Sequence, residues 1–286
     1  MRGGQWQALR LAEGLRQAGH TVTVLSRESS PCLEMARGLG LDAEPLTAGS
    51  VRRFSGQADL AHAHDARSHT LAALLSAAPL VVSRRVSFPI RGVISRWKYT
   101  RPRHFIAVSN FVKDVLIQSG VGPERISVVY DGVPLLTPSI AGETIIAPAS
   151  SDAQKGTALA VEAARLAGVP LRLSTDLERD LHGAGLFVYI THSEGLGSGV
   201  LLAMSAGVPV VASGVGGIPE IVEHERSGLL VDNAPRQIAN AILRLKEDRA
   251  LACRLAARGR QLVEERFSIP AMVAGTTRVY ERVLAC

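Results

Sequence analysis

The sequence LFVYITHSEGLGSGVLLAM occupies residues 186–204 and predicts a strand, a turn and a helix in that order. The apolar run 186–190 predicts a buried strand, and the apolar residues after the turn predict a buried helix. The turn holds three glycines within positions 195–199. Backbone N–H groups left uncovered at a helix N-terminus, together with the helix dipole, favour negative charge. Because the adjacent Glu194 carboxylate can accept hydrogen bonds from hydroxyls, the turn suits a phosphorylated sugar.

Length and composition limit the class of protein. The 286 residues are enough for two domains with separate hydrophobic cores. No apolar run approaches the roughly 18 residues that span a membrane, and the first residues, 1–4, are not followed by the apolar run of a signal peptide. Cys32, Cys253 and Cys286 are too far apart for a metal site and too few for a disulfide framework. These features predict a cytoplasmic α/β protein without a metal.

Basic residues are concentrated in the first half of the chain. Residues 1–141 hold 17 Lys and Arg against 10 Asp and Glu, whereas residues 142–286 hold 15 against 16. The segment 84–103 carries seven cations, three aromatic residues and no acid. Three interpretations are open: a solvated basic face, a surface for an anionic membrane or phosphorylated acceptor, and a nucleic-acid site. No zinc-finger spacing or RNA-binding signature is present, so no nucleic-acid partner is predicted. Arg84 and Arg85 are candidates for binding an anionic acceptor.

Strand-like and helix-like segments alternate along the chain. The predicted strands cover residues 21–25, 58–64, 80–83, 105–109, 126–130, 144–147, 171–173, 186–190, 209–212 and 229–231, with helical segments between them. This alternation predicts parallel sheets with helices on both faces, in which ligands bind beyond the carboxyl ends of the strands. The residues at or just past the ends of predicted strands are therefore candidate site residues, and they include His64, Ser109, Asp131 and Glu194.

A polar run with two prolines and a glycine at residues 134–143 marks the predicted domain boundary. We expect an N-terminal domain of residues 1–138 and a C-terminal domain of residues 139–267. A last helix, residues 268–286, is expected to pack back toward the N-terminal domain.

The chain resembles family 4 glycosyltransferases of the GT-B fold, through motifs that keep the family's order along nearly its whole length. The motifs are GGQ at 3–5, AGHTVTVL at 18–25, DLAHAH at 59–64, AVS at 107–109, VYDGV at 129–133, QKG at 154–156, SEGLGSG at 193–199, AGVPVVA at 206–212, VGGIPEIV at 215–222 and SGLLV at 227–231. The resemblance implies two Rossmann-like domains that face each other across a cleft. The first would bind an acceptor and the second a nucleotide-sugar donor. It also implies transfer with retention at the anomeric carbon. No metal ion is implied, because protein cations and amides neutralise the leaving diphosphate.

The resemblance also implies roles for individual residues. Lys155 would contact the donor diphosphate, Glu194 would hold sugar hydroxyls, and His64 would lie beside the transferred sugar. His64 and Glu194 are therefore the candidate catalytic residues. The other donor-binding candidates are Gly3, Gly4, Gly195, Leu196, Gly197, Ser198 and Gly199. The implied function is sugar transfer to an anionic, lipid-linked or glycan acceptor, in cell-envelope polysaccharide synthesis at the inner face of a membrane.

Several departures from the family pattern favour an alternative. Leu202 stands where the family has a second Glu, and Ser150 stands where it has an Arg. Glu194 lies only 39 positions after Lys155, so a strand and a helix of the nucleotide-binding half are expected to be absent. The apolar strand that precedes the first glycines in the family is also expected to be missing. The alternative is a catalytically weak or inactive relative that binds nucleotides or acts as a scaffold.

Overall fold

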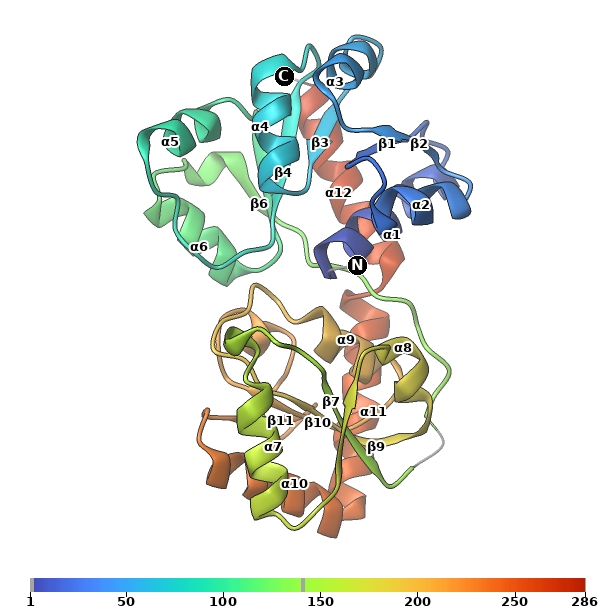
Figure 1. The fold of residues 1–286 in the computed structure, drawn as a ribbon, viewed down its shortest axis with the longest axis vertical. Coiled ribbons are helices and arrows are strands. Elements are labelled where there is room, and N and C mark those ends of the chain that lie inside the picture. The colour runs from blue at the N-terminus through green and yellow to red at the C-terminus, as the bar shows by residue number, and fades with distance from the viewer. Residues whose placement is uncertain (1–2, 140–141, 286) are drawn as a thin grey trace. The chain divides into compact units, whose positions relative to one another are not determined.

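The computed structural model describes residues 3–139 and 142–285, which form two compact units. Unit 1 comprises Met1–Gly132 and Ile269–Cys286, and unit 2 comprises Val133–Ser268. Each unit has parallel strands with helices packed against them (Figure 1), which confirms the predicted α/β class. The predicted domain boundary at residue 138 lies six residues beyond Gly132, and the predicted last helix belongs to unit 1.

The strands of unit 1 form two separate parallel sheets. β1 (Thr23–Ser26) pairs with β2 (Asp42–Pro45). The second sheet has the order β3 (Ala61–Ala63), β4 (Leu80–Arg84), β5 (His104–Ala107) and β6 (Ile126–Val128). No strand among the described residues joins these two sheets. The sequence predicts that an apolar strand before the first glycines is absent. This prediction concerns positions before Gly3, which lie outside the described residues, so it stays a prediction.

The last helix joins the elements of unit 1. The helices of this unit are α1 (Gly3–Gln17), α2 (Pro31–Gly38), α3 (Ala48–Ser55), α4 (Ala66–Leu75), α5 (Val93–Thr100), α6 (Asn110–Gln118) and α12 (Ile269–Leu284), with a short η1 (Pro123–Arg125). Met272 and Val273 of α12 pack against α1, and Val279 and Val283 pack against β4 and β5. One helix therefore covers apolar side chains from both ends of the unit's sequence.

Unit 2 contains one five-stranded parallel sheet. Its order is β11 (Leu229–Val231), β10 (Val210–Ser213), β9 (Ala184–Tyr189), β7 (Thr144–Pro148) and β8 (Leu171–Ser174). The central strand β9 is covered by helices on both faces, and its apolar residues suit this burial. Between β8 and β9 the chain forms only the short α8 (Leu177–Asp180) and η3 (Leu181–Gly183).

Helices cover both faces of the unit 2 sheet. They are α7 (Thr157–Leu166), α9 (Ser198–Ser205), α10 (Pro235–Glu247) and α11 (Arg249–Arg266), with the short η2 (Ala153–Lys155) and η4 (Ile218–Glu220). Leu186 and Val188 of β9 point into the core that α7 and α10 cover. Because side chains alternate along a strand, Phe187 and Tyr189 point to the opposite face, where α9 packs. Among the described helices, none is long and apolar enough to cross a bilayer.

Candidate functional site

The turn from β9 into α9 leaves two helix amides without protein acceptors. Gly197 is the N-cap residue, with a φ of 107° that L side chains rarely adopt, and no side chain caps the helix. Val200 and Leu201 donate their N–H groups to the Gly197 carbonyl, at 2.9 and 3.2 Å. In the part of the chain that the structure describes, the N–H groups of Ser198 and Gly199 have no acceptor. These donors and the positive end of α9 suit an anion.

The Glu194 carboxylate, just before this helix, accepts hydrogen bonds on both oxygens. Lys155 Nζ and Tyr189 Oη donate to its Oε2 at 2.7 and 2.6 Å, and the Gly195 N–H donates to its Oε1 at 3.2 Å. We call Lys155, Tyr189 and Glu194 the Glu194 cluster. The Glu194 side chain is 16% exposed and the Lys155 side chain 37%. Lys155 is therefore the partner that an incoming anion can most readily draw away from the carboxylate.

Tyr189 was not among the sequence candidates. It is the last residue of β9, and its ring lies beneath the start of α9, because a Cβ placed on Gly199 would be 3.1 Å from the ring. Burial, followed by the charge of Glu194, raises the pKa of Tyr189 well above its usual value. The phenol therefore stays protonated and donates to Glu194 at neutral pH. The signal in the sequence was strand alternation, which places this side chain on the α9 face where the strand ends.

The loop before η4 packs its backbone against the Glu194 turn. The Gly217 N–H donates to the Glu194 carbonyl oxygen at 3.2 Å. A Cβ on Gly216 would lie 2.0 Å from that oxygen, and a Cβ on Gly217 would lie 2.2 Å from the Gly195 carbonyl oxygen. Only glycine at these two positions lets the loops approach so closely, and this contact fixes the backbone that carries the Glu194 side chain.

A buried polar network ties the ends of β9 and β10 to the segment that carries Lys155. The Thr191 N–H donates to Ser213 Oγ at 3.0 Å, and Ser213 Oγ donates to Asn233 Oδ1 at 2.6 Å. Asn233 Nδ2 donates to the Thr191 carbonyl at 2.9 Å, and Thr191 Oγ1 donates to the carbonyl of Gln154 at 3.0 Å. The network holds Lys155, the next residue after Gln154, near the Glu194 turn. Sequence reasoning did not identify these positioning residues.

In unit 1, His64 follows β3 directly and is held by an arginine. Arg85 Nη1 lies 3.0 Å from His64 Nδ1, and Arg85 Nε donates to the Asp131 carboxylate at 2.9 and 3.2 Å. Because a guanidinium only donates hydrogen bonds, His64 Nδ1 is the acceptor and the ring proton lies on Nε2. We call His62, His64, Arg85 and Asp131 the His64 cluster.

Both histidines of this cluster are neutral. The ring centroids of His62 and His64 are 4.0 Å apart. His62 Nδ1 lies 2.6 Å from Tyr280 Oη on α12, and its Nε2 lies 2.9 Å from Ser83 Oγ on β4. Burial, followed by the charge of Arg85, lowers the pKa of His62 to about 3. Burial has the largest effect on the pKa of His64, and electrostatic interactions with His62 and then Arg85 add to it. Together they lower this pKa well below its usual value. His64 therefore offers an uncharged Nε2–H donor at pH 7.

The other unit 1 candidates lie in different surroundings. Gly3 and Gly4 begin α1, and Gly4 lies beside the His64 cluster, since a Cβ on it would be 3.7 Å from Arg85 Cδ. Arg84 is buried, and its guanidinium donates to the Tyr99 hydroxyl and to a backbone carbonyl. The acceptor roles of Arg84 and Arg85 stay predictions, because the contacts described for both side chains lie within unit 1.

Three further positions from the sequence have local roles. Leu202 is buried in α9. Ser150 Oγ accepts the N–H of Asp152 at 3.2 Å. Ser109 is buried and caps α6, with its Oγ accepting the N–H of Val112 at 3.1 Å. Leu202 and Ser150 therefore provide no charged group at the two positions where the family pattern has a Glu and an Arg.

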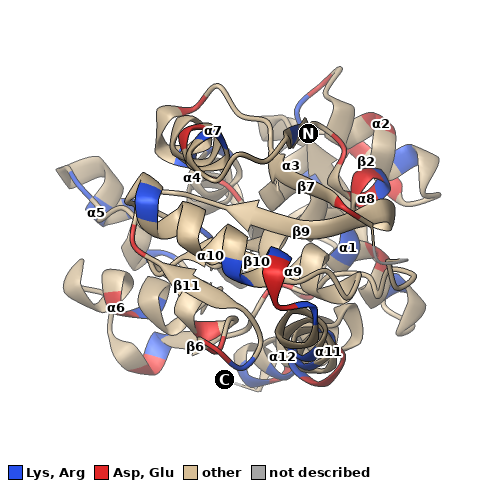
Figure 2. Ribbon diagram, turned by 90° about the horizontal axis from the view of Figure 1, so that it is seen from below, with Lys and Arg blue, Asp and Glu red and all other residues tan. Residues whose placement is uncertain are grey.

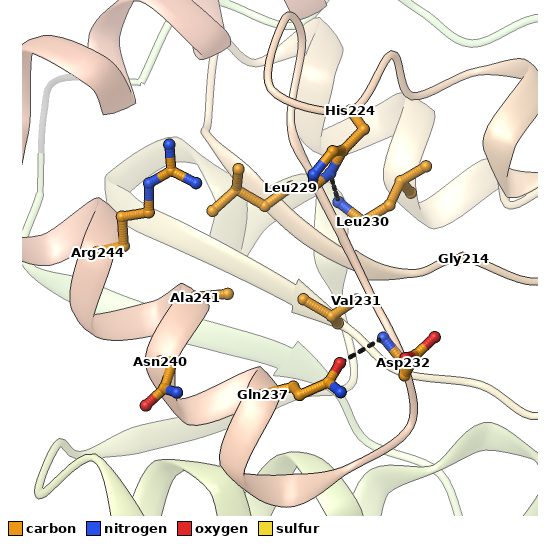
Figure 3. Close-up of a pocket in the computed structure, with 10 residues that line it drawn as sticks. All are labelled: Gly214, His224, Leu229, Leu230, Val231, Asp232, Gln237, Asn240, Ala241 and Arg244. Atoms are coloured by element: carbon orange, nitrogen blue, oxygen red, sulfur yellow. Dashed lines mark hydrogen bonds between the residues drawn. The ribbon is translucent and has the colours of Figure 1, made fainter.

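A pocket of about 400 Å³ lies between β11 and α10 and contains none of the candidate residues. Figure 3 shows its lining: Gly214, His224, Leu229, Leu230, Val231, Asp232, Gln237, Asn240, Ala241 and Arg244. His224 Nδ1 accepts the Leu230 N–H at 3.0 Å, and Gln237 Oε1 accepts the Asp232 N–H at 3.3 Å. Within residues 3–139 and 142–285, no group of three or more His, Cys, Asp or Glu is placed to hold a metal ion.

Comparison with known proteins gives a family match in each half of the chain. Residues 1–135 match the family described as Glycosyltransferase Family 4, and residues 135–248 match the family described as Glycosyl transferases group 1.

Curated relatives match shorter segments. A GDP-mannose-dependent alpha-(1-6)-phosphatidylinositol monomannoside mannosyltransferase of Mycobacterium tuberculosis is 44% identical over 82 residues, which are 28% of this chain and 20% of that protein. A D-inositol 3-phosphate glycosyltransferase of Nocardioides is 37% identical over 118 residues, which are 41% of this chain and 26% of that protein. The matched segments thus span 20% and 26% of the lengths of these two relatives.

Solved structures match nearly the whole chain. Anabaena HepE in complex with UDP and glucose superposes with a TM-score of 0.86 at 16% identity, over 98% of this chain and 96% of that chain. Sucrose-phosphate synthase from Thermosynechococcus elongatus superposes with a TM-score of 0.76 at 18% identity, over 96% and 92%. At these identities the likeness shows a shared fold.

Proposed function

The chain belongs to glycosyltransferase family 4 and has the GT-B fold, and on this premise we propose that it is a retaining glycosyltransferase. It moves a sugar from a nucleotide-sugar donor to an anionic, lipid-linked or glycan acceptor, in cell-envelope polysaccharide synthesis at the inner face of a membrane. Support for this acceptor class comes from relatives named for phosphatidylinositol monomannoside and for D-inositol 3-phosphate. Both names describe a molecule that carries a phosphate.

The observation that carries the proposal is the Lys155–Glu194 ion pair beside the uncapped start of α9. A nucleotide sugar brings the two kinds of group that this arrangement can hold. Its phosphate oxygens suit Lys155 and the amides of Ser198 and Gly199, and its sugar hydroxyls suit the Glu194 carboxylate. When the phosphates attract Lys155, Glu194 keeps its bond from Tyr189 and gains room for a sugar hydroxyl.

The reaction we propose needs no protein nucleophile. The bond between the anomeric carbon and the diphosphate oxygen breaks, and the acceptor oxygen bonds to that carbon on the same face. The acceptor proton passes to the departing phosphate oxygen. Lys155 and the α9 amides stabilise the negative charge that develops on the leaving diphosphate, and the proposal includes no metal ion.

His64 serves as an orienting donor in this proposal. Its ring is neutral, its Nδ1 is occupied by Arg85, and its Nε2–H is the group available to a sugar oxygen. A neutral donor orients a sugar without competing with Lys155 for the phosphates.

The proposal is tested by calorimetric titration with UDP, GDP, ADP and their common sugar conjugates. One nucleotide series should bind in the micromolar range. Lys155→Met should weaken both the diphosphate and its sugar conjugate by roughly 10- to 100-fold, the scale of a lost charged hydrogen bond. Glu194→Gln should weaken the sugar conjugate and spare the free diphosphate. Lys246→Met, at an exposed lysine of α10, is the matched control. A folded protein that binds no nucleotide would contradict the proposal.

A second candidate is a nucleotide-binding protein that transfers no sugar. The buried Leu202 and the uncharged Ser150 favour it, since neither supplies the ligand expected at its position. Nucleotide binding without release of sugar from any donor, with or without acceptor, would select this candidate.

A further inference from the structure

Large apolar side chains are exposed in one segment of unit 1. Phe88 is 62% exposed, Val93 84%, Ile94 81% and Trp97 42%. They lie on the loop before α5 and on α5 itself. A soluble surface normally shows such residues singly, and a group of them marks an interaction site.

The exposure of α5 follows from the way this helix is anchored. Tyr99 is buried, stacks on Phe105 with ring centroids 5.4 Å apart, and meets the His69 ring edge-on at 4.8 Å. At about 100° per residue, Val93, Ile94 and Trp97 fall within one third of the helix circumference, away from Tyr99. The anchored face of the helix therefore forces its apolar face outward.

Cations surround this apolar face. Arg91, Arg96, Arg101 and Arg103 are exposed, and the Arg101 guanidinium lies 5.7 Å from the centre of the Trp97 ring. No Asp or Glu occurs between Asp65 and Asp114. Figure 2 shows α5 with blue segments and no red ones. We call Phe88 and residues 91–103 the α5 surface.

We propose that the α5 surface docks on an anionic lipid bilayer. The exposed aliphatic side chains and Trp97 suit the boundary between headgroups and acyl chains, and the arginines suit anionic headgroups. A single-stranded nucleic acid would use the arginines and the aromatic rings but would leave Val93 and Ile94 without partners. The inference rests on the proposed function for the location at a membrane face. Its evidence is the exposure and charge of the α5 surface, which do not depend on whether the protein transfers a sugar.

The test is flotation of the full chain with vesicles of phosphatidylcholine alone or with 30% phosphatidylglycerol. The protein should float with the anionic vesicles and remain at the bottom with the neutral ones. Val93→Ser with Ile94→Ser should reduce the partition coefficient at least roughly tenfold, through lost apolar burial. Arg91→Gln with Arg96→Gln should reduce it roughly fivefold for each arginine. Val161→Ser with Leu166→Ser, at exposed apolar residues of α7 in unit 2, should bind as the unaltered protein does.

Two results would overturn the inference. One is no flotation of the folded protein with anionic vesicles, including the case in which single-stranded RNA or an acidic peptide binds instead. The other is flotation that the α5 variants leave unchanged. Lys155→Met should float normally, and the α5 variants should bind nucleotide normally. A failed docking surface and a failed donor site therefore give different results.

Discussion

At the scale of single residues, Tyr189 is the partner that distinguishes Glu194 from an ordinary helix-start carboxylate. Its hydroxyl donates to Oε2 at 2.6 Å from a buried position. Tyr189→Phe should lower the free energy of unfolding by about 1.5–3 kcal/mol, the range for a hydrogen bond to a charged group. Urea unfolding measures this loss. Tyr130→Phe is the control, because the Tyr130 hydroxyl accepts a solvent-exposed hydrogen bond from Asn110 Nδ2. An equal loss of unfolding free energy in both variants would contradict the role of Tyr189.

The residue scale also sets a pH dependence through His62. Its pKa is lowered to about 3 in the folded protein, so between pH 6.5 and pH 3 the unfolded chain binds a proton that the folded chain does not. Stability therefore rises with pH across this range. From pH 6.5 down to pH 5, His62 should remove about 1.6 kcal/mol of unfolding free energy.

Urea unfolding at these two pH values should show a smaller difference in His62→Gln than in the unaltered protein. The comparison uses the pH difference within each variant, so a uniform loss of stability in His62→Gln does not affect it. The same pH difference in both proteins would show that His62 does not carry the effect.

At the scale of elements, the contact between the Glu194 turn and the loop before η4 depends on Gly216. A Cβ there would lie 2.0 Å from a backbone oxygen, and φ is 59°. Gly216→Ala should lower the free energy of unfolding by about 2–4 kcal/mol, through strain and displacement of the turn. It should also weaken nucleotide-sugar binding, since Glu194 moves with its backbone.

Gly168→Ala is the matched control for Gly216→Ala. Gly168 also has a positive φ, of 63°, but no neighbouring atom lies within 4 Å of the added Cβ. Its cost should be about 1 kcal/mol, with normal binding in titration calorimetry. Equal effects of the two substitutions would show that backbone strain alone, without the loop contact, explains the loss.

The elements that sequence reasoning found are those whose local pattern and burial agree. β9 was predicted at 186–190 and occurs at Ala184–Tyr189, because an uninterrupted apolar run fits a strand covered on both faces. β2, at Asp42–Pro45, was missed because Asp, Glu and Pro are poor strand formers. α5 was missed as a helix because its other large apolar residues face outward and Tyr99 is its only buried residue.

Within the candidate site, sequence could indicate the residues but not their pairings. Glu194 and Lys155 were both candidates, yet the bond between them depends on how Gln154 is tied to Thr191 across the sheet. His64 was a candidate because it follows a strand. Its tautomer depends on Arg85, which belongs to a different strand end and which sequence reasoning assigned to the acceptor. Such pairings arise from packing between distant segments, which local periodicity does not report.

At the scale of the whole molecule, the chain returns to unit 1 after completing unit 2, and α12 carries that return. Its side chains Met272, Val273, Val279 and Val283 are buried against α1, β4 and β5. Removing residues 269–286 would expose these contacts, each worth about 1.5–3 kcal/mol, which together rival the stability of a domain. Among the described residues, the unit 2 core that α7 and α10 cover contains no side chain of α12.

Deletion of residues 269–286 should therefore unfold unit 1 and leave unit 2 folded. Hydrogen exchange read by mass spectrometry should show lost protection in β4 and β5 and unchanged protection in β7, β9 and β10. Leu284→Ser, at an exposed position on α12, should leave both patterns unchanged. Because α12 also supplies Tyr280 to His62, the deletion should disturb the His64 cluster while Lys155 and Glu194 keep their geometry. Equal loss of protection in both units would mean that the two cores are one cooperative structure, and the division of the chain at Gly132 would then have no energetic meaning.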